Sequence, residues 1–183
     1  HSAKIKKNGS VVMSMKTPHY RSDKIAPEGL NGFFVDSGAR HFVCESKKMG
    51  DDYVFEMGKK IRNSNLFHPE GINVNFYNLI NHNCVEVKTY EKGVEKVMLS
   101  CASGSTAVVF HLSQINAISS PIITKSIGGN LTITFDKKWQ EAWVEGPAEF
   151  LFDGEYDFTI YGTLKAIGTE SDSIIFDNFG TDK

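Results

Sequence analysis

Apolar and polar residues alternate in many short stretches of this chain. The stretch 72–77 alternates strictly, and the stretch 85–90 begins in the same way. A period of two is typical of a strand with one buried face. Between these stretches lie turn residues, mainly Gly, Asp and Pro, which interrupt regular structure. Further short strands are expected at 11–15, 30–35, 42–44, 97–99, 122–125, 131–135, 142–144, 149–152, 158–161 and 174–176.

Two segments depart from this alternation. Apolar residues recur every four positions from Met49 to Ile61, which predicts a helix over 48–62 with one apolar stripe. The segment 106–115 is apolar on nearly every side, and such a helix is expected to be buried. We therefore predict an α+β fold in which a curved β-sheet or barrel wraps around a central helix.

Composition narrows the possible functions. The 183 residues carry a net charge of -2, which gives no basic surface for nucleic acid or an anionic membrane. The apolar runs are too short to span a bilayer, and no secretory signal opens the chain. The three cysteines form no CxxC pair, which indicates reduced thiols and a cytoplasmic location.

Cys101 is the residue most suited to chemistry. It lies where a predicted strand gives way to the buried helix, and small residues follow it at 102–105. Free N–H groups at a helix N-terminus lower the pKa of a thiol and can also bind a carboxylate. A thiolate beside a carboxylate clamp suits removal of a proton α to a carboxylate. The alternative is a buried structural cysteine, which packs as a small apolar side chain.

Several segments, in order along the chain, resemble the C-terminal half of diaminopimelate epimerases. A Y-E-R-G segment of that family is similar to 90–93, and an L-A-C-G-T-G-A segment to 99–105. P-E-G-x-N-V-x-F is similar to 69–76. G-G-x-L is similar to 128–131, and the G-P-A-x-x-V-F-x-G-E ending to 146–155. Residues 12–18 resemble the strand that closes the family's first domain.

The resemblance implies an isomerase that uses neither pyridoxal phosphate nor a metal. Members fold as two similar domains with an amino-acid substrate between them, and one thiol from each domain faces the α carbon. The implied reaction interconverts LL- and meso-diaminopimelate, in the synthesis of lysine and peptidoglycan precursors. No E-x-C-G-N-G segment for the other thiol occurs in this sequence. A missing N-terminal half or a partner subunit is therefore expected to supply it, and a homodimer is possible by analogy.

The same resemblance divides the chain and assigns its site. Residues 1–20 are expected to close the missing domain, 21–160 to form the C-terminal domain, and 161–183 to be a tail of unassigned role. The catalytic residues implied are Cys101, Glu91 and His41. Those implied to bind substrate are Asn73, Glu91, Lys92, Ala102, Ser103 and Gly104.

Four departures from the family pattern leave alternatives open. Ala39 and Arg40 replace the Asn and Pro of a G-N-P-H segment, Lys92 replaces an arginine, and Ala102 replaces a glycine. Lys92 cannot copy a bidentate arginine contact to a carboxylate. The substrate could therefore be another amino acid, or the domain could bind without catalysis. An isomerase with a carboxylate acid/base, as in phenazine-biosynthesis relatives, is a third hypothesis.

Overall fold

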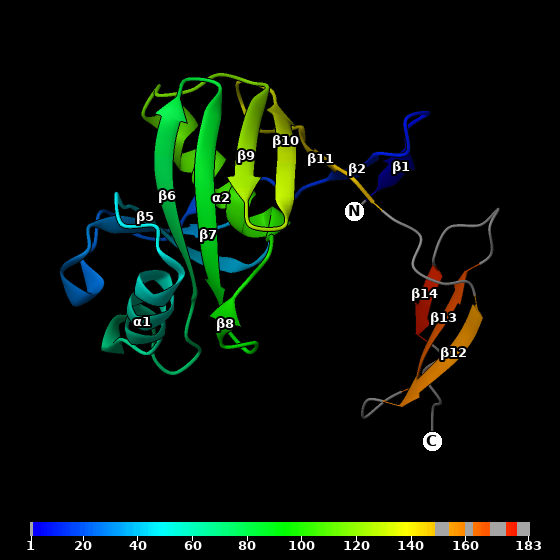
Figure 1. The fold of residues 1–183 in the computed structure, drawn as a ribbon, viewed down its shortest axis with the longest axis horizontal. Helices are drawn as coiled ribbons and strands as arrows, with labels where there is room; N and C mark the ends of the chain where they lie inside the picture. Colours follow the sequence, from blue (N-terminus) through cyan, green and yellow to red (C-terminus); the bar gives the residue numbers. More distant parts are fainter. Residues whose placement is uncertain (1, 149–153, 160–162, 169–174, 179–183) are drawn as a thin grey trace. The chain divides into compact units, whose positions relative to one another are not determined.

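The computed structural model describes residues 2–148, 154–159, 163–168 and 175–178. The chain divides into two compact units, residues 1–147 and 148–183 (Figure 1). The domain boundaries expected at residues 20 and 160 stay predictions. Among the helices of the described residues, none has the length and apolar character needed to cross a membrane.

The first unit is built on one eleven-stranded sheet. Its path runs β1-β2-β11-β10-β9-β7-β6-β5-β4-β3, and β8 pairs with β7. The strands are β1 (Ala3–Ile5), β2 (Val11–Ser14), β3 (His19–Tyr20), β4 (Gly32–Asp36), β5 (Arg40–Glu45), β6 (Asn73–Asn81), β7 (Cys84–Glu91), β8 (Lys96–Val97), β9 (Ile122–Ser126), β10 (Gly129–Phe135) and β11 (Ala142–Gly146).

Two helices connect the two parallel strand pairs of this sheet. Strand β5 is parallel to β6, with α1 (Asp51–Arg62) between them in the chain. Strand β7 is parallel to β9, and α2 (Ala102–Gln114) lies between those. Parallel neighbours need such a crossover, and crossovers are right-handed. Strands β5 and β7 run in opposite directions, yet the connections from β5 to β6 and from β7 to β9 move in the same direction across the sheet. Two right-handed crossovers with this relation place their helices on opposite faces of the sheet.

Two separate hydrophobic cores confirm this arrangement. One core surrounds α2 and takes residues from β4 to β7 and from β9 to β11, among them Val87, Val108 and Ile133. The other core packs α1 against the opposite sheet face, with Phe42, Ile61 and Phe76 at zero exposure. The sheet curls around α2, as Figure 1 shows. The predicted α+β fold, a curved sheet wrapped around a central helix, is therefore confirmed.

Both predicted helices exist, and each starts at a different residue from the one predicted. Helix α1 begins at Asp51 rather than at residue 48, because Gly50 has extended backbone angles and forms the N-cap. Helix α2 begins at Ala102 rather than at residue 106. The small residues 102–105, which precede the apolar segment 106–115, form the first turn of this helix.

The second unit contains a three-stranded antiparallel sheet. Its strands are β12 (Gly154–Thr159), β13 (Thr163–Gly168) and β14 (Ile175–Asn178), in that order. The strands predicted at 158–161 and 174–176 overlap β12 and β14. The strand predicted at 149–152 lies outside the described residues.

Helix α1 approaches the sheet closely at Gly58. A Cβ at this position would lie 2.7 Å from Tyr90 Cγ, on β7. We expect Gly58→Ala to lower the free energy of unfolding by about 1–3 kcal/mol, because overpacking forces the helix away from the sheet. Urea denaturation measures this. The control Glu56→Ala, on the exposed side of the same helix, should change stability by less than about 0.5 kcal/mol. Equal effects of the two changes would contradict the close approach.

Candidate functional site

Cys101 is the N-cap residue of the central helix α2. Its backbone is extended, with φ -142° and ψ 106°, and its sulfur accepts a hydrogen bond from the Gly104 N–H at 3.3 Å. The Ser103 hydroxyl lies 3.6 Å from the same sulfur. The thiol is thus held by the first turn of the helix, as the sequence predicted, and it remains partly accessible.

The pKa of the Cys101 thiol differs in direction from the prediction. Burial raises this pKa above its ordinary value, and the hydrogen bonds from Ser103 and Gly104 offset only part of that effect. The negative charge of Glu91 raises it further. The helix N-terminus does supply stabilising N–H groups, but desolvation of the sulfur outweighs them. In this structure the neutral thiol is favoured at neutral pH.

His41, on β5, lies fully buried beneath the first turn of α2. Its Nε2 is 3.0 Å from Ser103 Oγ, and its Nδ1 is 3.0 Å from Asn75 Nδ2. Burial lowers the pKa of His41 from 6.5 to about 4, so the imidazole is neutral at physiological pH. Ser103 therefore links His41 to Cys101.

Asn75 is a residue of this site that the sequence reasoning missed. It is fully buried in the middle of β6, and its Oδ1 accepts a hydrogen bond from Thr89 Oγ1 at 2.8 Å across the β6–β7 pair. A buried asparagine inside a strand is unfavourable unless its amide is satisfied. A strand asparagine is as unfavourable at position 75 as at position 73, and residues two apart on a strand share a face, so this signal in the sequence could have found Asn75.

Glu91, Asn73 and Lys92 lie near one another where β6 and β7 pair. Glu91 is two residues after Thr89 on β7 and so shares its face, toward α2. Asn73 Oδ1 accepts a hydrogen bond from the Lys92 N–H at 2.9 Å, which fixes the chain just after Glu91. The amide nitrogen of Asn73 is not used in that bond. The predicted substrate contacts of Asn73, Glu91 and Lys92 stay predictions, as does the clamp from Ala102, Ser103 and Gly104.

Arg40 belongs to the opposite face of the sheet from His41. Its guanidinium pairs with Glu70 at 3.0 Å and lies 5.1 Å from the Phe34 ring centroid. Adjacent strand residues point to opposite faces, so Arg40 lies on the α1 side while His41 faces α2. The positive charge of Arg40 is therefore on the face of the sheet opposite to the one that carries His41 and the thiol site.

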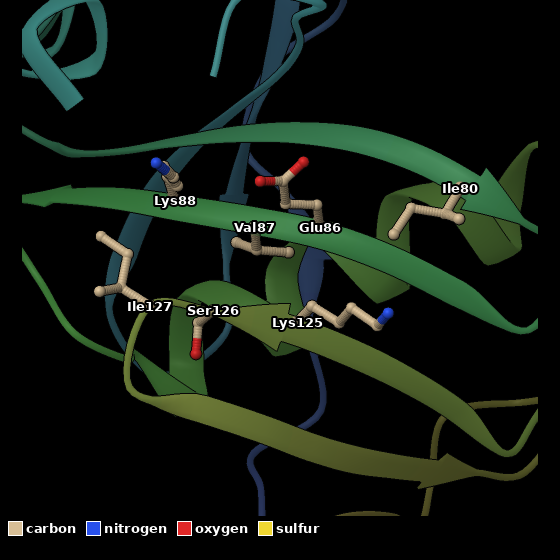
Figure 2. A pocket seen from close by; sticks show the side chains of 7 residues that line it. All are labelled: Ile80, Glu86, Val87, Lys88, Lys125, Ser126 and Ile127. Carbon is tan, nitrogen blue, oxygen red and sulfur yellow. The ribbon is translucent and has the colours of Figure 1, made fainter. Parts of the chain in front are cut away.

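Other candidate sites lie apart from this cluster. Within the described residues, no group of three or more His, Cys, Asp or Glu side chains could hold a metal ion. A pocket of about 230 Å³ opens where β7 and β9 separate (Figure 2). Its lining shares no residue with the predicted site. The lining residues are Ile80, Glu86, Val87, Lys88, Lys125, Ser126 and Ile127.

Comparison with known proteins confirms the resemblance seen in the sequence. The chain is 30% identical over 158 residues to the diaminopimelate epimerase of Aquifex aeolicus, covering 83% of this chain and 57% of that protein. It is 34% identical over 164 residues to the diaminopimelate epimerase of Methanothrix thermoacetophila, covering 84% and 57%. The chain is therefore a relative of the diaminopimelate epimerases, and it spans a little over half the length of these relatives. No family model matches it.

A solved structure shows the same fold. A hydroxyproline epimerase from Agrobacterium vitis, solved with trans-4-hydroxy-L-proline bound, superposes with a TM-score of 0.62 at 16% identity. The match covers 79% of this chain and 52% of that protein. At this identity the likeness shows the fold alone, and it supports the sheet curled around a central helix.

The buried His41 predicts a particular dependence of stability on pH. Its folded-state pKa lies below its unfolded value, so the unfolded chain binds the proton first as pH falls. We expect the free energy of unfolding to fall by on the order of 3 kcal/mol between about pH 6.5 and pH 4 from this group. The variant His41→Gln should lack that loss, as urea denaturation at each pH would show. His82→Gln, at an exposed turn, should keep it.

Gly104 is expected to tolerate no larger side chain. A Cβ there would collide with Asn75 Oδ1 and would lie 3.2 Å from both Cys101 Sγ and Thr89 Oγ1. We expect Gly104→Ala to displace the first turn of α2 from β6, with a cost of about 1–3 kcal/mol in unfolding free energy. Urea denaturation checks this cost. A variant as stable as the parent would show that the helix does not approach β6 this closely.

Proposed function

We propose that this chain forms one half of an amino-acid epimerase or racemase in which the Cys101 thiolate exchanges the α-proton of the substrate. The observation that carries the proposal is the position of Cys101 as the N-cap of the central helix, beside the Ser103 hydroxyl and the Gly104 N–H. The sequence relationship to diaminopimelate epimerases supports it. A purely structural cysteine would not need hydrogen-bond donors around a partly accessible sulfur.

The proposed reaction is a proton transfer on each face of one carbon. In one direction, the Cys101 thiolate removes the α-proton and becomes a thiol, and the electron pair stays on the α carbon. A second thiol on the opposite face then donates its proton to that carbon and becomes a thiolate. The product has inverted configuration, and the two sulfurs have exchanged protonation states. The reaction needs no cofactor or metal.

The N-terminal turn of α2 suits the substrate's α-carboxylate. Backbone N–H groups of Ala102, Ser103 and Gly104 carry the positive end of the helix dipole, which favours an anion. A carboxylate held there would place its α carbon close to Cys101. Glu91, on the same sheet face, is suited to the substrate ammonium group.

Diaminopimelate is the first candidate substrate, and a different amino acid is the second. The second candidate is favoured by Lys92 and Ala39, which depart from the family pattern at positions implied to hold the distal end of the substrate. It is favoured also by the position of Arg40 on the far face of the sheet, paired with Glu70. A non-catalytic binding domain of the same fold would use the helix N-terminus without the thiol.

The second thiol is proposed to come from a polypeptide segment that this chain does not contain. The chain spans about half the length of its curated relatives, and the sequence holds no E-x-C-G-N-G-like segment. The intact mass of the protein purified from its native source tests this. A mass well above 20.4 kDa, with upstream peptides that carry the second cysteine, is expected. A mass near 20.4 kDa would require a separate subunit.

We expect Cys101→Ser in the native full protein to lower the rate of α-proton exchange by about a thousandfold or more, because a hydroxyl is a far weaker base than a thiolate. The measurement is deuterium incorporation from D2O into diaminopimelate, and then into a panel of other amino acids. The matched control is Cys84→Ser, at the start of β7, which should keep the parent rate. Full exchange activity in Cys101→Ser would overturn the proposal. Absence of exchange with every amino acid in the parent protein would favour a binding domain.

A further inference from the structure

A continuous series of hydrogen-bonding side chains links the middle of the sheet to Cys101. Thr89 Oγ1 lies 2.8 Å from Asn75 Oδ1, and Asn75 Nδ2 lies 3.0 Å from His41 Nδ1. His41 Nε2 lies 3.0 Å from Ser103 Oγ, which is 3.6 Å from Cys101 Sγ. We call these five residues the Thr89–Cys101 series. Thr89, Asn75 and His41 are buried, so water cannot substitute for a missing partner.

The direction of each hydrogen bond follows from the Asn75 amide. Its nitrogen faces the carbonyl oxygen of Phe42 at 3.2 Å, and a carbonyl can only accept. Its oxygen faces the Thr89 hydroxyl, which can donate. The opposite amide orientation would place two acceptors together at Phe42. The amide nitrogen therefore also donates to His41 Nδ1.

An imidazole nitrogen that accepts a hydrogen bond carries no proton. We infer that Asn75 is a positioning residue that fixes His41 as the neutral Nε2–H tautomer, so that the Ser103 hydroxyl hydrogen is available to the Cys101 sulfur when that sulfur is a thiolate. Nε2–H donates to Ser103 Oγ, and the single hydroxyl hydrogen of Ser103 is left for Sγ. This inference deepens the proposed function, because it states how the thiolate is stabilised.

This arrangement also gives His41 a different role from the catalytic one that the sequence predicted. A base that took the thiol proton through Ser103 would need a free lone pair on Nε2. In this structure that lone pair belongs to Nδ1, which faces Asn75. His41 thus acts on Cys101 as a fixed donor through Ser103. The charged groups that act on this pair are Glu91 of β7 on Cys101 and Asp36 of β4 on His41.

The first test observes the parent protein directly and needs no turnover. In the 15N-labelled chain, long-range 1H–15N correlation spectra report which ring nitrogen of each of the six histidines carries the proton. The spectrum of His41→Gln identifies the His41 signals. We expect the Nε2–H tautomer of His41 between pH 6 and 8. Protonation at Nδ1 in the parent protein would overturn the inference, whether or not the protein is an epimerase.

The second test measures the donor role through the rate at which iodoacetamide alkylates Cys101, followed at that peptide by mass spectrometry from pH 6 to 10. Ser103→Ala removes the donor, and we expect about a tenfold slower reaction at pH 7, equivalent to about one pKa unit. Ser103→Thr keeps a hydroxyl and should restore most of the rate.

The same alkylation assay tests His41. His41→Gln keeps an N–H toward Ser103 and should react within about threefold of the parent, whereas His41→Leu should be slowed about as much as Ser103→Ala. Equal loss in both His41 variants would show that His41 acts as a base.

The third test isolates Asn75. Asn75→Leu removes the donor to Nδ1, and we expect a new Nδ1–H signal together with slower alkylation. The control Asn78→Leu, on the opposite face of the same strand, should change neither. In a Ser103→Ala background, Asn75→Leu should cause no additional slowing, because its effect passes through Ser103. Additive slowing, with the fold intact by circular dichroism, would overturn the inference.

Discussion

The close approach of the first turn of α2 to strand β6 is the contact on which the candidate site depends. Gly104 lies so near Asn75 that a single methyl group would collide with the amide oxygen. Only at this separation can Ser103 reach His41 while Cys101 caps the helix. The absence of a side chain at one position thus aligns residues from three strands with the helix N-terminus.

The site shows a competition between burial and hydrogen bonding at one sulfur. The helix N-terminus favours a thiolate, as the sequence predicted, but the cost of desolvating a negative charge is larger and raises the thiol pKa. Each hydrogen-bond donor that reaches the sulfur therefore stabilises the thiolate more strongly than it would in water. This explains why a series of buried polar residues, which is costly if any member lacks a partner, is retained behind Cys101.

The two helices of the first unit have different tasks because they lie on different faces. The right-handed crossovers place α1 and α2 on opposite sides of one sheet, and each face has its own core. The polar residues of the site occur on the α2 face of β5, β6 and β7. On the α1 face, Phe42, Val74, Phe76 and Tyr90 belong to the other core, and the charged residues Lys88 and Arg40 pair with Asp51 and Glu70. The fold thereby separates a face that supports the sheet from a face that holds the thiol.

The sequence by itself determined the strands near 72–77 and 85–90, the amphipathic and buried helices, the relationship to diaminopimelate epimerases, and the place of Cys101 between a strand and the central helix. These features depend on local periodicity, on small residues and on ordered motifs, all of which are visible along one chain. Reasoning from the sequence singled out Asn73 and missed Asn75, although both lie on the same face of β6.

Only the tertiary structure decided what the site residues do to one another. The bonds from Thr89 to Asn75, from Asn75 to His41 and from His41 to Ser103 join residues of three strands and one helix, and no spacing along the chain encodes them. The direction of the Cys101 pKa shift was also beyond the sequence, because it depends on how far the sulfur is buried. Desolvation and hydrogen-bond direction are properties of packed neighbours, and those neighbours are set by the fold.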